Sequence, residues 1–319
     1  MTAAAARFLG PAINTTARVL GLSDRDAASV TYGCCDRNYW HYKIIDVANA
    51  RFQEAGLLFA LAYATEAPGN PFFRKARILE WSRAAWRFWL RQRNRDGSLA
   101  EVYPNERSFC ATAFSAAAFV ESVALLGGAP TWTEELGRAQ TTMDWLARND
   151  NPEVGNQMAA SLLALTGYAR LTGNPNYAAA AGARRKDVLA MAQGDGTLPE
   201  YGGRDLGYQT ISLAALARVL RIARGDAEIE ALVRKGLAPV EAGLDADGRA
   251  DPAKNSRGTQ FIYPSALAAL GSPALERVLA GLAKGRILRP VWMDDRYCIA
   301  FASDYWLAFQ EGSRADVAR

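Results

Sequence analysis

An Asp-Gly-x-Leu-x-Glu pattern occurs twice in the sequence, 99 residues apart, and each copy is followed by a further acid. The matched acids are Glu101 and Glu106 in the first copy and Glu200 and Asp205 in the second. Hydrolysis of a glycosidic bond needs a protonated carboxyl and a second carboxylate, which two such loops could supply. We therefore regard Glu106, Glu200 and Asp205 as candidate catalytic residues. The alternative is that these acids cap the helices that follow them.

A different reaction, β-elimination next to a uronate carboxylate, needs a base and a group that neutralises the carboxylate. His41 is the only histidine and could titrate near neutral pH, although a lone histidine is often structural. Tyr208 and Tyr263 are the other candidate bases. The candidate neutralising residues are Asn156, Gln157, Arg204 and Arg257. Asparagine and glutamine before a helix are also common caps, so each of these signals is weak alone.

Further aromatic and charged side chains in the polar loops could bind a sugar, because aromatic rings offer flat apolar faces. These candidates are Asp36, Arg37, Tyr39, Trp40, Lys43, Tyr103, Asn105, Tyr201, Trp292, Asp294 and Asp295. The charged members of the first and last loops could instead form a salt-bridge seam joining the two ends of the array. The tryptophans at positions 81, 86 and 89 share one helical segment, and we expect them in the core.

Composition excludes several classes of protein. Half of the residues are hydrophobic and 22% are charged, as in a soluble globular protein, and the formal charge is only +4. Without a Lys/Arg run we expect no nucleic-acid partner. Cys34, Cys35, Cys110 and Cys298 lack metal-site spacing, so we expect reduced thiols, no metal and no cofactor. The sequence contains no apolar window of about 18 residues and no secretory pattern at its start, which predicts no membrane span and a cytoplasmic location.

The elements that must position these residues are helical hairpins. Six polar loops precede six apolar helices rich in small residues, which begin near residues 47, 109, 157, 208, 264 and 298. Each of the first five is followed by a turn and a returning helix richer in Arg, Glu and Trp. Residues 4–21 form a lead-in helix that we expect to close one side of the fold, interrupted at Pro11 and at Asn14-Thr15.

Small residues permit close packing, so the six apolar helices should form an inner ring and the returning helices an outer ring. The fold class is therefore all-α, an (α/α)6 toroid, and we expect residues 1–319 to form one domain with a lead-in and cap segment over 1–30. A closed ring would gather all six loops on one face. The helix N-termini on that face favour anionic groups of a ligand.

This layout resembles the (α/α)6 toroid of glycan-active enzymes, namely unsaturated glucuronyl hydrolases and heparinase II/III-type lyases. The resemblance covers residues 30–310 and rests on Tyr39-Trp40-His41-Tyr42, on Asn156-Gln157 and on Arg257 with Phe261-Ile262-Tyr263-Pro264. Two features depart from the lyase pattern: the chain leaves no room for an appended β-sheet domain, and it has no second histidine. The resemblance implies an activity on glycans without specifying the reaction.

Four functions are consistent with these observations. The first is cleavage of a glycosidic bond in an acidic oligo- or polysaccharide, with hydrolysis preferred because the repeated residues are carboxylates. The second is β-elimination by a polysaccharide lyase, and the third is a toroid that binds glycans or acts as a scaffold without catalysis. The fourth is a terpenoid-cyclase-like barrel, but the sequence lacks the D-x-D-D stretch that such a protein would need. The sequence does not indicate the oligomeric state.

Overall fold

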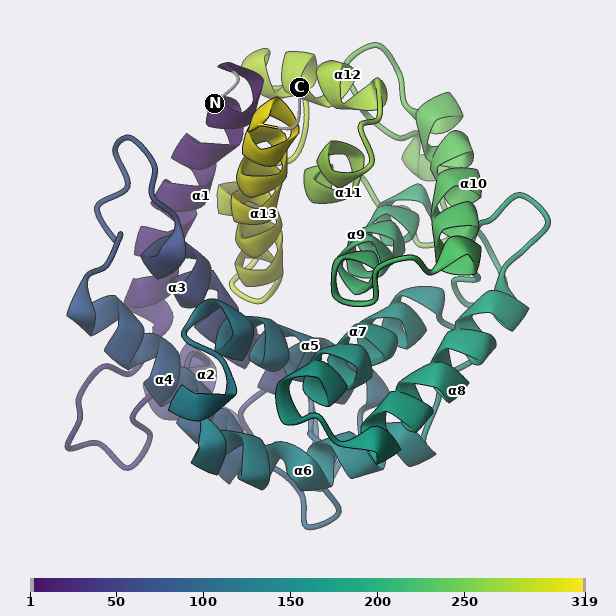
Figure 1. Ribbon diagram of the computed structural model, residues 1–319. Coiled ribbons are helices and arrows are strands. Elements are labelled where there is room, and N and C mark those ends of the chain that lie inside the picture. Colours follow the sequence, from purple (N-terminus) through teal and green to yellow (C-terminus); the bar gives the residue numbers. More distant parts are fainter. Residues whose placement is uncertain (1–2, 318–319) are drawn as a thin grey trace.

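Six helices rich in small apolar residues form an inner ring (Figure 1). In the computed structural model, which describes residues 3–317, they are α3 (Ala55–Ala64), α5 (Phe109–Leu125), α7 (Gly155–Thr172), α9 (Leu206–Ile222), α11 (Pro264–Ala269) and α13 (Tyr297–Val317). Each inner helix contacts the next, and α13 contacts α3, so the ring closes. No β-strand occurs between residues 3 and 317, which confirms the predicted all-α toroid.

An outer ring of helices surrounds the inner one. It consists of α4 (Ala76–Arg91), α6 (Thr133–Arg148), α8 (Pro175–Met191), α10 (Ala227–Gly243) and α12 (Ala274–Ala283), each packed on the inner helix that precedes it, and of α1 (Ala3–Leu22). Shorter elements lie in the connections: α2 (Arg37–Trp40) and the 3₁₀ helices Ala50–Glu54, Ala129–Thr131, Pro252–Lys254 and Pro290–Trp292. The first inner helix therefore starts at Ala55, later than the start near residue 47 that the sequence predicts.

The N-terminal helix completes the sixth pair, because α1 packs along α13 and brings the two ends of the chain together (Figure 1). The expected interruption of this helix is wrong: α1 continues through Pro11. It packs on α13, with Phe8 edge-on to Tyr305 at 5.3 Å and the Trp306 indole donating to the Thr16 hydroxyl at 3.0 Å. These contacts compensate for the helical hydrogen bond that Pro11 cannot donate, because proline has no backbone N–H.

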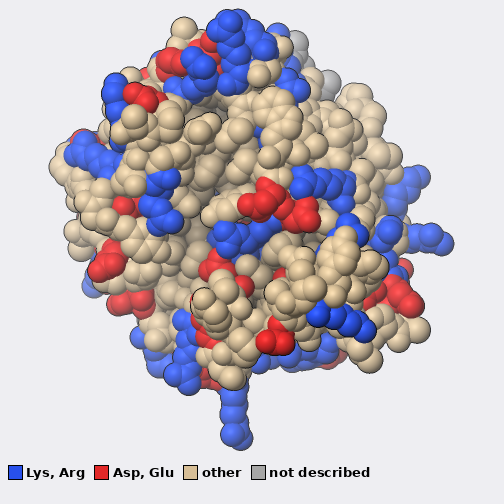
Figure 2. All heavy atoms as spheres, turned by 180° about the vertical axis from the view of Figure 1, so that it is seen from behind, with Lys and Arg blue, Asp and Glu red and all other residues tan. Residues whose placement is uncertain are grey.

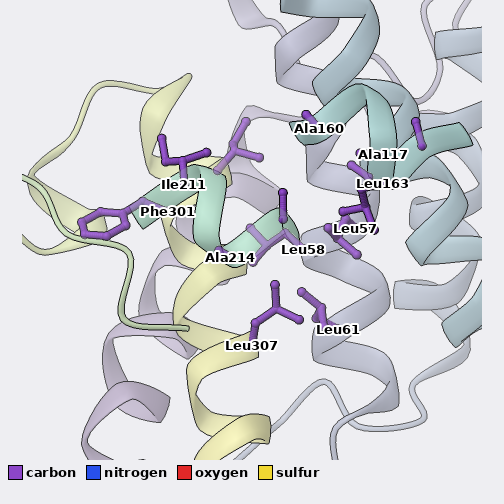
Figure 3. Close-up of a cluster of buried hydrophobic side chains, with 14 of the residues drawn as sticks. Leu57, Leu58, Leu61, Ala117, Ala160, Leu163, Ile211, Ala214, Phe301 and Leu307 are labelled. Atoms are coloured by element: carbon purple, nitrogen blue, oxygen red, sulfur yellow. The ribbon is translucent and has the colours of Figure 1, made fainter. Parts of the chain in front are cut away.

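The core lies where the inner helices face one another. Figure 3 shows leucine, isoleucine, alanine and phenylalanine side chains from α3, α5, α7, α9 and α13 converging. A second layer joins the two rings: Trp86 and Trp89 are fully buried, and Trp89 stacks on Phe119 of α5 with 5.2 Å between ring centroids. These two tryptophans are core residues, as predicted, while Trp81 is only partly buried.

The repeated Asp-Gly pattern is a turn that docks each loop on an outer helix. Asp96 accepts from the backbone N–H of Ser98 at 3.0 Å, and Asp195 accepts from that of Thr197 at 3.1 Å. The glycine between them, Gly97 or Gly196, has a positive φ, and a Cβ on it would lie 2.2 Å or 2.5 Å from the backbone of the outer helix. The two copies are therefore equivalent structural units that hold Glu101 and Glu200 in equivalent places.

Candidate active site

The inner ring encloses a cavity of about 260 Å³ that runs along its axis. Five inner helices line it, and alanines at 117, 118, 160 and 215 leave the space open because larger side chains would fill it. From Tyr297 near the loops to Leu307 deeper in the ring the cavity follows α13 for ten residues, or roughly 15 Å. Seen from behind (Figure 2), acidic and basic side chains lie next to each other in the middle of the molecule.

A tight turn in the fourth loop brings Glu200 into the cavity. Glu200 forms an isolated antiparallel bridge with Val154 of the third loop, and its N–H and C=O bond with Gly203 at 3.1 Å each. The turn between them uses left-handed backbone at Tyr201 and Gly202, with φ of 48° and 76°. The result is a glutamate that lines the cavity but is only 3% exposed.

Two polar side chains from other loops contact the Glu200 carboxylate. The side-chain amide of Asn156, in the first turn of α7, donates to it at 2.5 Å, and the Arg257 guanidinium lies 3.7 Å away. Burial raises the pKa of Glu200 to about 7, and the charge of Asp205 adds to this rise, while Arg257 and Asn156 oppose it. A carboxyl with this pKa can both take and give a proton near neutral pH.

Tyr208, in the first turn of α9, lies next to this group. Burial raises the pKa of its hydroxyl, and the nearby Tyr297, with which it shares a hydrogen bond, raises it further. The Arg257 guanidinium lies 4.7 Å from the ring centre of Tyr201 and 5.9 Å from that of Tyr208. Tyr208 is thus held in its protonated form beside the Arg257 cation, as a proton donor requires.

The other glutamates of the cavity are paired with arginines. Glu101 of the second loop, the repeat partner of Glu200, bonds to Arg296 of the last loop at 2.6 Å. Four such pairs line the cavity: Glu54 with Arg51, Glu101 with Arg296, Glu121 with Arg218, and Glu200 with Arg257. The arginines neutralise the carboxylates inside the protein, where an unpaired buried charge would cost free energy.

A second buried acid lies deeper in the cavity, on α13. Asp304 accepts from the backbone N–H of Ser265 at 3.1 Å and from its hydroxyl, and burial raises its pKa to about 7. Near it, Arg218 of α9 reaches Glu121 of α5 at 2.8 Å. This end of the cavity is therefore also polar, although its walls are alanine and leucine.

The structure brings seven of the predicted site residues together on this cavity, from three different loops. They are Asn156, Gln157, Glu200, Tyr201, Tyr208, Arg257 and Tyr263. Tyr263 stacks on Phe301 with 5.3 Å between ring centroids, and burial raises its pKa. Their assigned roles stay predictions, but the expected convergence of distant loops on one site is present.

Glu106 does not line the cavity. One of its carboxylate oxygens accepts three backbone N–H groups of its own loop, from Glu101 at 2.8 Å, Val102 at 2.6 Å and Tyr103 at 3.2 Å. This oxygen folds the loop, and Ser108 rather than Glu106 caps α5. The structure therefore gives Glu106 a structural role within its loop, which is neither the catalytic role nor the helix cap that we had considered.

Asp205 also lies outside the cavity, as the N-cap of α9. It accepts from the backbone N–H of Tyr208 at 3.1 Å, from that of Arg257 at 3.1 Å and from the Thr259 hydroxyl. With all these donors aimed at it, Asp205 holds the backbone of two cavity residues rather than facing a substrate. Asp205 and Glu106 therefore match in the repeat because both carboxylates organise their loops by accepting backbone N–H groups.

The predicted residues of the first loop do not line the cavity. His41 is exposed at the end of α2, with its ring 5.1 Å from that of Trp40. Tyr39, Trp40 and Lys43 line a separate surface hollow. Asp36 caps α2 and also accepts from the backbone N–H of Asn49, and Arg37 donates to the hydroxyl of Tyr42.

The remaining predicted residues lie around the cavity rather than in it. Tyr103 and Asn105 are exposed in the second loop, Trp292 lines another surface hollow, and Arg204 pairs with Asp195 at 2.7 Å. Asp294 accepts two backbone N–H groups at the start of α13. Asp295 pairs with Arg18 of α1 at 2.6 Å. A seam between the chain ends therefore exists, but its basic partner comes from α1 and not from the first loop.

Sequence reasoning missed several cavity residues. They are Arg51, Glu54, Cys110, Phe114, Glu121, Arg218, Tyr297 and Asp304. Three of them gave a signal, since Glu121 is the only charge in α5, and Arg218 and Asp304 interrupt apolar stretches of α9 and α13. A charge in such a helix must find a partner or face a cavity.

Neither a metal site nor a membrane-spanning helix is found in the part of the chain that the structure describes. No group of three or more His, Cys, Asp and Glu side chains there is arranged to hold a metal ion. None of its helices is long and apolar enough to cross a bilayer. The four cysteines are free thiols, and burial raises the pKa of Cys110 on the cavity wall to about 11.

Comparison with known proteins gives a likeness of fold alone. No protein-family model matches the sequence, and no curated protein matches it. The structure is similar to chondroitin AC lyase of Streptomyces coelicolor A3 in complex with chondroitin sulphate, with a TM-score of 0.62 and 14% identity over 99% of this chain. A tyrosine-to-alanine variant of that lyase gives 0.59, and a protein from Actinoplanes gives 0.53 at 14% identity. The chain spans 45% of the length of the lyase and 99% of the Actinoplanes protein's.

Proposed function

We propose that this protein cleaves a glycosidic bond in a uronate-containing oligo- or polysaccharide by β-elimination. The observation that carries the proposal is the convergence of a carboxyl with a pKa of about 7, a tyrosine hydroxyl, an amide and a guanidinium at one place in the cavity. The similar fold of a chondroitin lyase supports a glycan as the ligand.

The four side chains have complementary parts in such a reaction. Arg257 and Asn156 can donate to the uronate carboxylate, which makes the adjacent C–H more acidic. Glu200 then takes this proton, and Tyr208 gives its own proton to the leaving glycosidic oxygen as the C–O bond breaks. The products are a sugar with a new C=C bond and a chain with a free hydroxyl, and the tyrosinate regains a proton from Glu200 or water.

The charges around Glu200 are consistent with this order of proton transfers. The Arg257 guanidinium lies 3.7 Å from Glu200, longer than a direct hydrogen bond, so it can turn to a second carboxylate. A bound uronate would also bring negative charge near Glu200, which favours proton uptake by that carboxyl. The raised pKa of Tyr208 fits a donor better than a base.

Hydrolysis is the second candidate, and one observation favours it. Glu101 and Glu200 occupy equivalent positions in two loops and line the same cavity, so one could donate a proton while the other activates water. In β-elimination Glu101 would instead only hold Arg296 in place.

The test is incubation of the purified protein with uronate-containing polysaccharides, chondroitin sulphate first. Elimination yields a product that absorbs in the near ultraviolet, and hydrolysis yields new reducing ends without this absorbance. Binding without any product, unchanged in Glu200→Gln and Tyr208→Phe, would mean a non-catalytic glycan-binding toroid and would overturn the proposal.

A further inference from the structure

A second hollow, of about 640 Å³, lies outside the central cavity. It is a groove between the loop that follows α10 and the loop that precedes α13, and we call it the 249–292 groove. Its lining includes Arg249, Lys254, Gln260, Arg286 and Trp292. None of these residues lines the central cavity, so the groove is a separate site.

Trp292 is the aromatic surface of this groove. It is 54% exposed at the end of a 3₁₀ helix, which is unusual for the largest side chain. The Arg289 guanidinium lies 5.2 Å from the centre of its ring, which fixes the indole in the groove wall. An exposed, fixed indole offers a flat face to a sugar ring.

The charge around Trp292 is predominantly basic. The groove and its rim contain five basic side chains and three acidic ones: Arg249, Lys254, Lys284, Arg286 and Arg289 against Asp245, Asp247 and Asp251. Asp247 is shared by Lys284 at 2.7 Å and Arg286 at 2.6 Å, and these two partners lower its pKa to about 2. The cluster of Asp247, Lys284 and Arg286 therefore carries a net charge of +1, and an acidic group of a saccharide would share these cations with Asp247. Figure 2 shows basic side chains gathered at the top of the molecule, where α12 lies in Figure 1.

The same two loops continue into the cavity. Arg257 follows Lys254 by three residues, and Arg296 follows Trp292 by four, so Lys254 and Trp292 each lie at most roughly 10–14 Å along the chain from a cavity arginine. A polymer that lies in the groove would thus lead toward Glu101 and Glu200.

We propose that the 249–292 groove is a second binding site for an anionic saccharide chain, with Trp292 stacking on a sugar and Arg249 and Arg286 binding its acidic groups. The inference rests on the proposed function for the class of ligand. It adds that long acidic polymers bind at two places, whereas short oligosaccharides bind in the cavity alone.

Two measurements test this inference, with Trp292→Ala, Trp292→Phe and the double variant Arg249→Ala/Arg286→Ala. In affinity gel electrophoresis with immobilised chondroitin sulphate, the first and third variants should be retarded roughly three- to tenfold less than the wild type. Trp292→Phe should recover most of the retardation, because it keeps a ring. Arg138→Ala on the surface of α6 is the matched control for loss of one exposed arginine and should not differ.

Kinetics give the second measurement. With the polymer, KM should rise roughly three- to tenfold in Trp292→Ala at unchanged kcat, while a tetrasaccharide should show no change. Equal retardation of wild type and Trp292→Ala, or equal retardation by double-stranded DNA of matched charge, would overturn the groove as a saccharide site. Retardation that depends on Trp292 without turnover of any glycan would support the groove and refute the proposed reaction.

Discussion

The side-chain amide of Asn156 donates a hydrogen bond to the carboxylate of Glu200 across 44 positions of the sequence. The bridge between Val154 and Glu200 sets this contact, because it aligns the end of the third loop with the turn of the fourth. Asn156 follows Val154 by two residues, in the first turn of α7, and its side chain points at the carboxylate. The contact stabilises the charged form of an acid that burial otherwise keeps protonated.

The first prediction concerns the pH dependence of stability. The pKa of Glu200 rises from 4.5 to about 7 on folding, so between these values the folded state binds more protons than the unfolded state. The free energy of unfolding should therefore fall as pH rises through this window. Glu200→Gln should lose this part of the dependence and, near pH 8, exceed the wild type in stability by about 1–3 kcal/mol.

Urea unfolding at several pH values measures this effect. Asp304 carries a similar raised pKa, so Asp304→Asn should flatten the remaining slope over the same range. Parallel pH profiles for the wild type and Glu200→Gln would show that Glu200 is ionised in the folded protein throughout.

The second prediction concerns Tyr208 in catalysis. If its hydroxyl donates the proton to the leaving oxygen, Tyr208→Phe should lower kcat by about 10²- to 10⁴-fold, with little effect on folding. Tyr103→Phe is the matched control, because Tyr103 is 70% exposed and lies outside the cavity. Initial rates on a uronate polymer measure the difference, and a kcat for Tyr208→Phe within a few-fold of the wild type would remove Tyr208 from the mechanism.

The third prediction separates structure from chemistry at Glu106. Since one carboxylate oxygen accepts three backbone N–H groups, Glu106→Ala should lower the free energy of unfolding by about 1–3 kcal/mol. Glu106→Gln retains an acceptor and should cost less. The exposed Glu134 of α6 is the control, and Glu134→Ala should change stability by less than about 0.5 kcal/mol.

Measuring the activity of the Glu106 variants completes this third test. The kcat of folded Glu106→Gln should stay within a few-fold of the wild type, because the side chain does not reach the cavity. A loss as large as that of Tyr208→Phe, at unchanged stability, would restore Glu106 as a catalytic candidate.

The ring was predictable from the sequence because its cause is local. Alanine-rich helices after polar loops and amphipathic returning helices recur along the chain, and each recurrence is visible in a window of about 40 residues. The prediction of a break at Pro11 was wrong because its outcome depends on contacts that are not local. Whether a proline interrupts a helix depends on the packing of that helix, and α1 packs on α13, almost 300 residues away.

The site was predictable only in part. The repeat correctly paired Glu200 with Glu101, but it could not distinguish these cavity residues from Glu106 and Asp205, which point at backbone N–H groups. The direction of a side chain in a loop is set by the turn, and a turn of unusual backbone such as that at Tyr201 has little sequence signature.

The fourth prediction concerns the ion pair between Arg218 of α9 and Glu121 of α5, which joins two inner helices that flank α7. Their side chains are 18% and 16% exposed, so Arg218→Met leaves a mostly buried carboxylate short of a cation. We expect it to lower the free energy of unfolding by about 3 kcal/mol, whereas the double variant Arg218→Met/Glu121→Leu should recover most of the loss. Arg234→Met, which breaks an exposed pair with Glu230 on α10, should cost less than about 0.5 kcal/mol. Equal losses in the single and double Arg218 variants in urea unfolding would mean that the arginine stabilises the ring by packing and not by its charge.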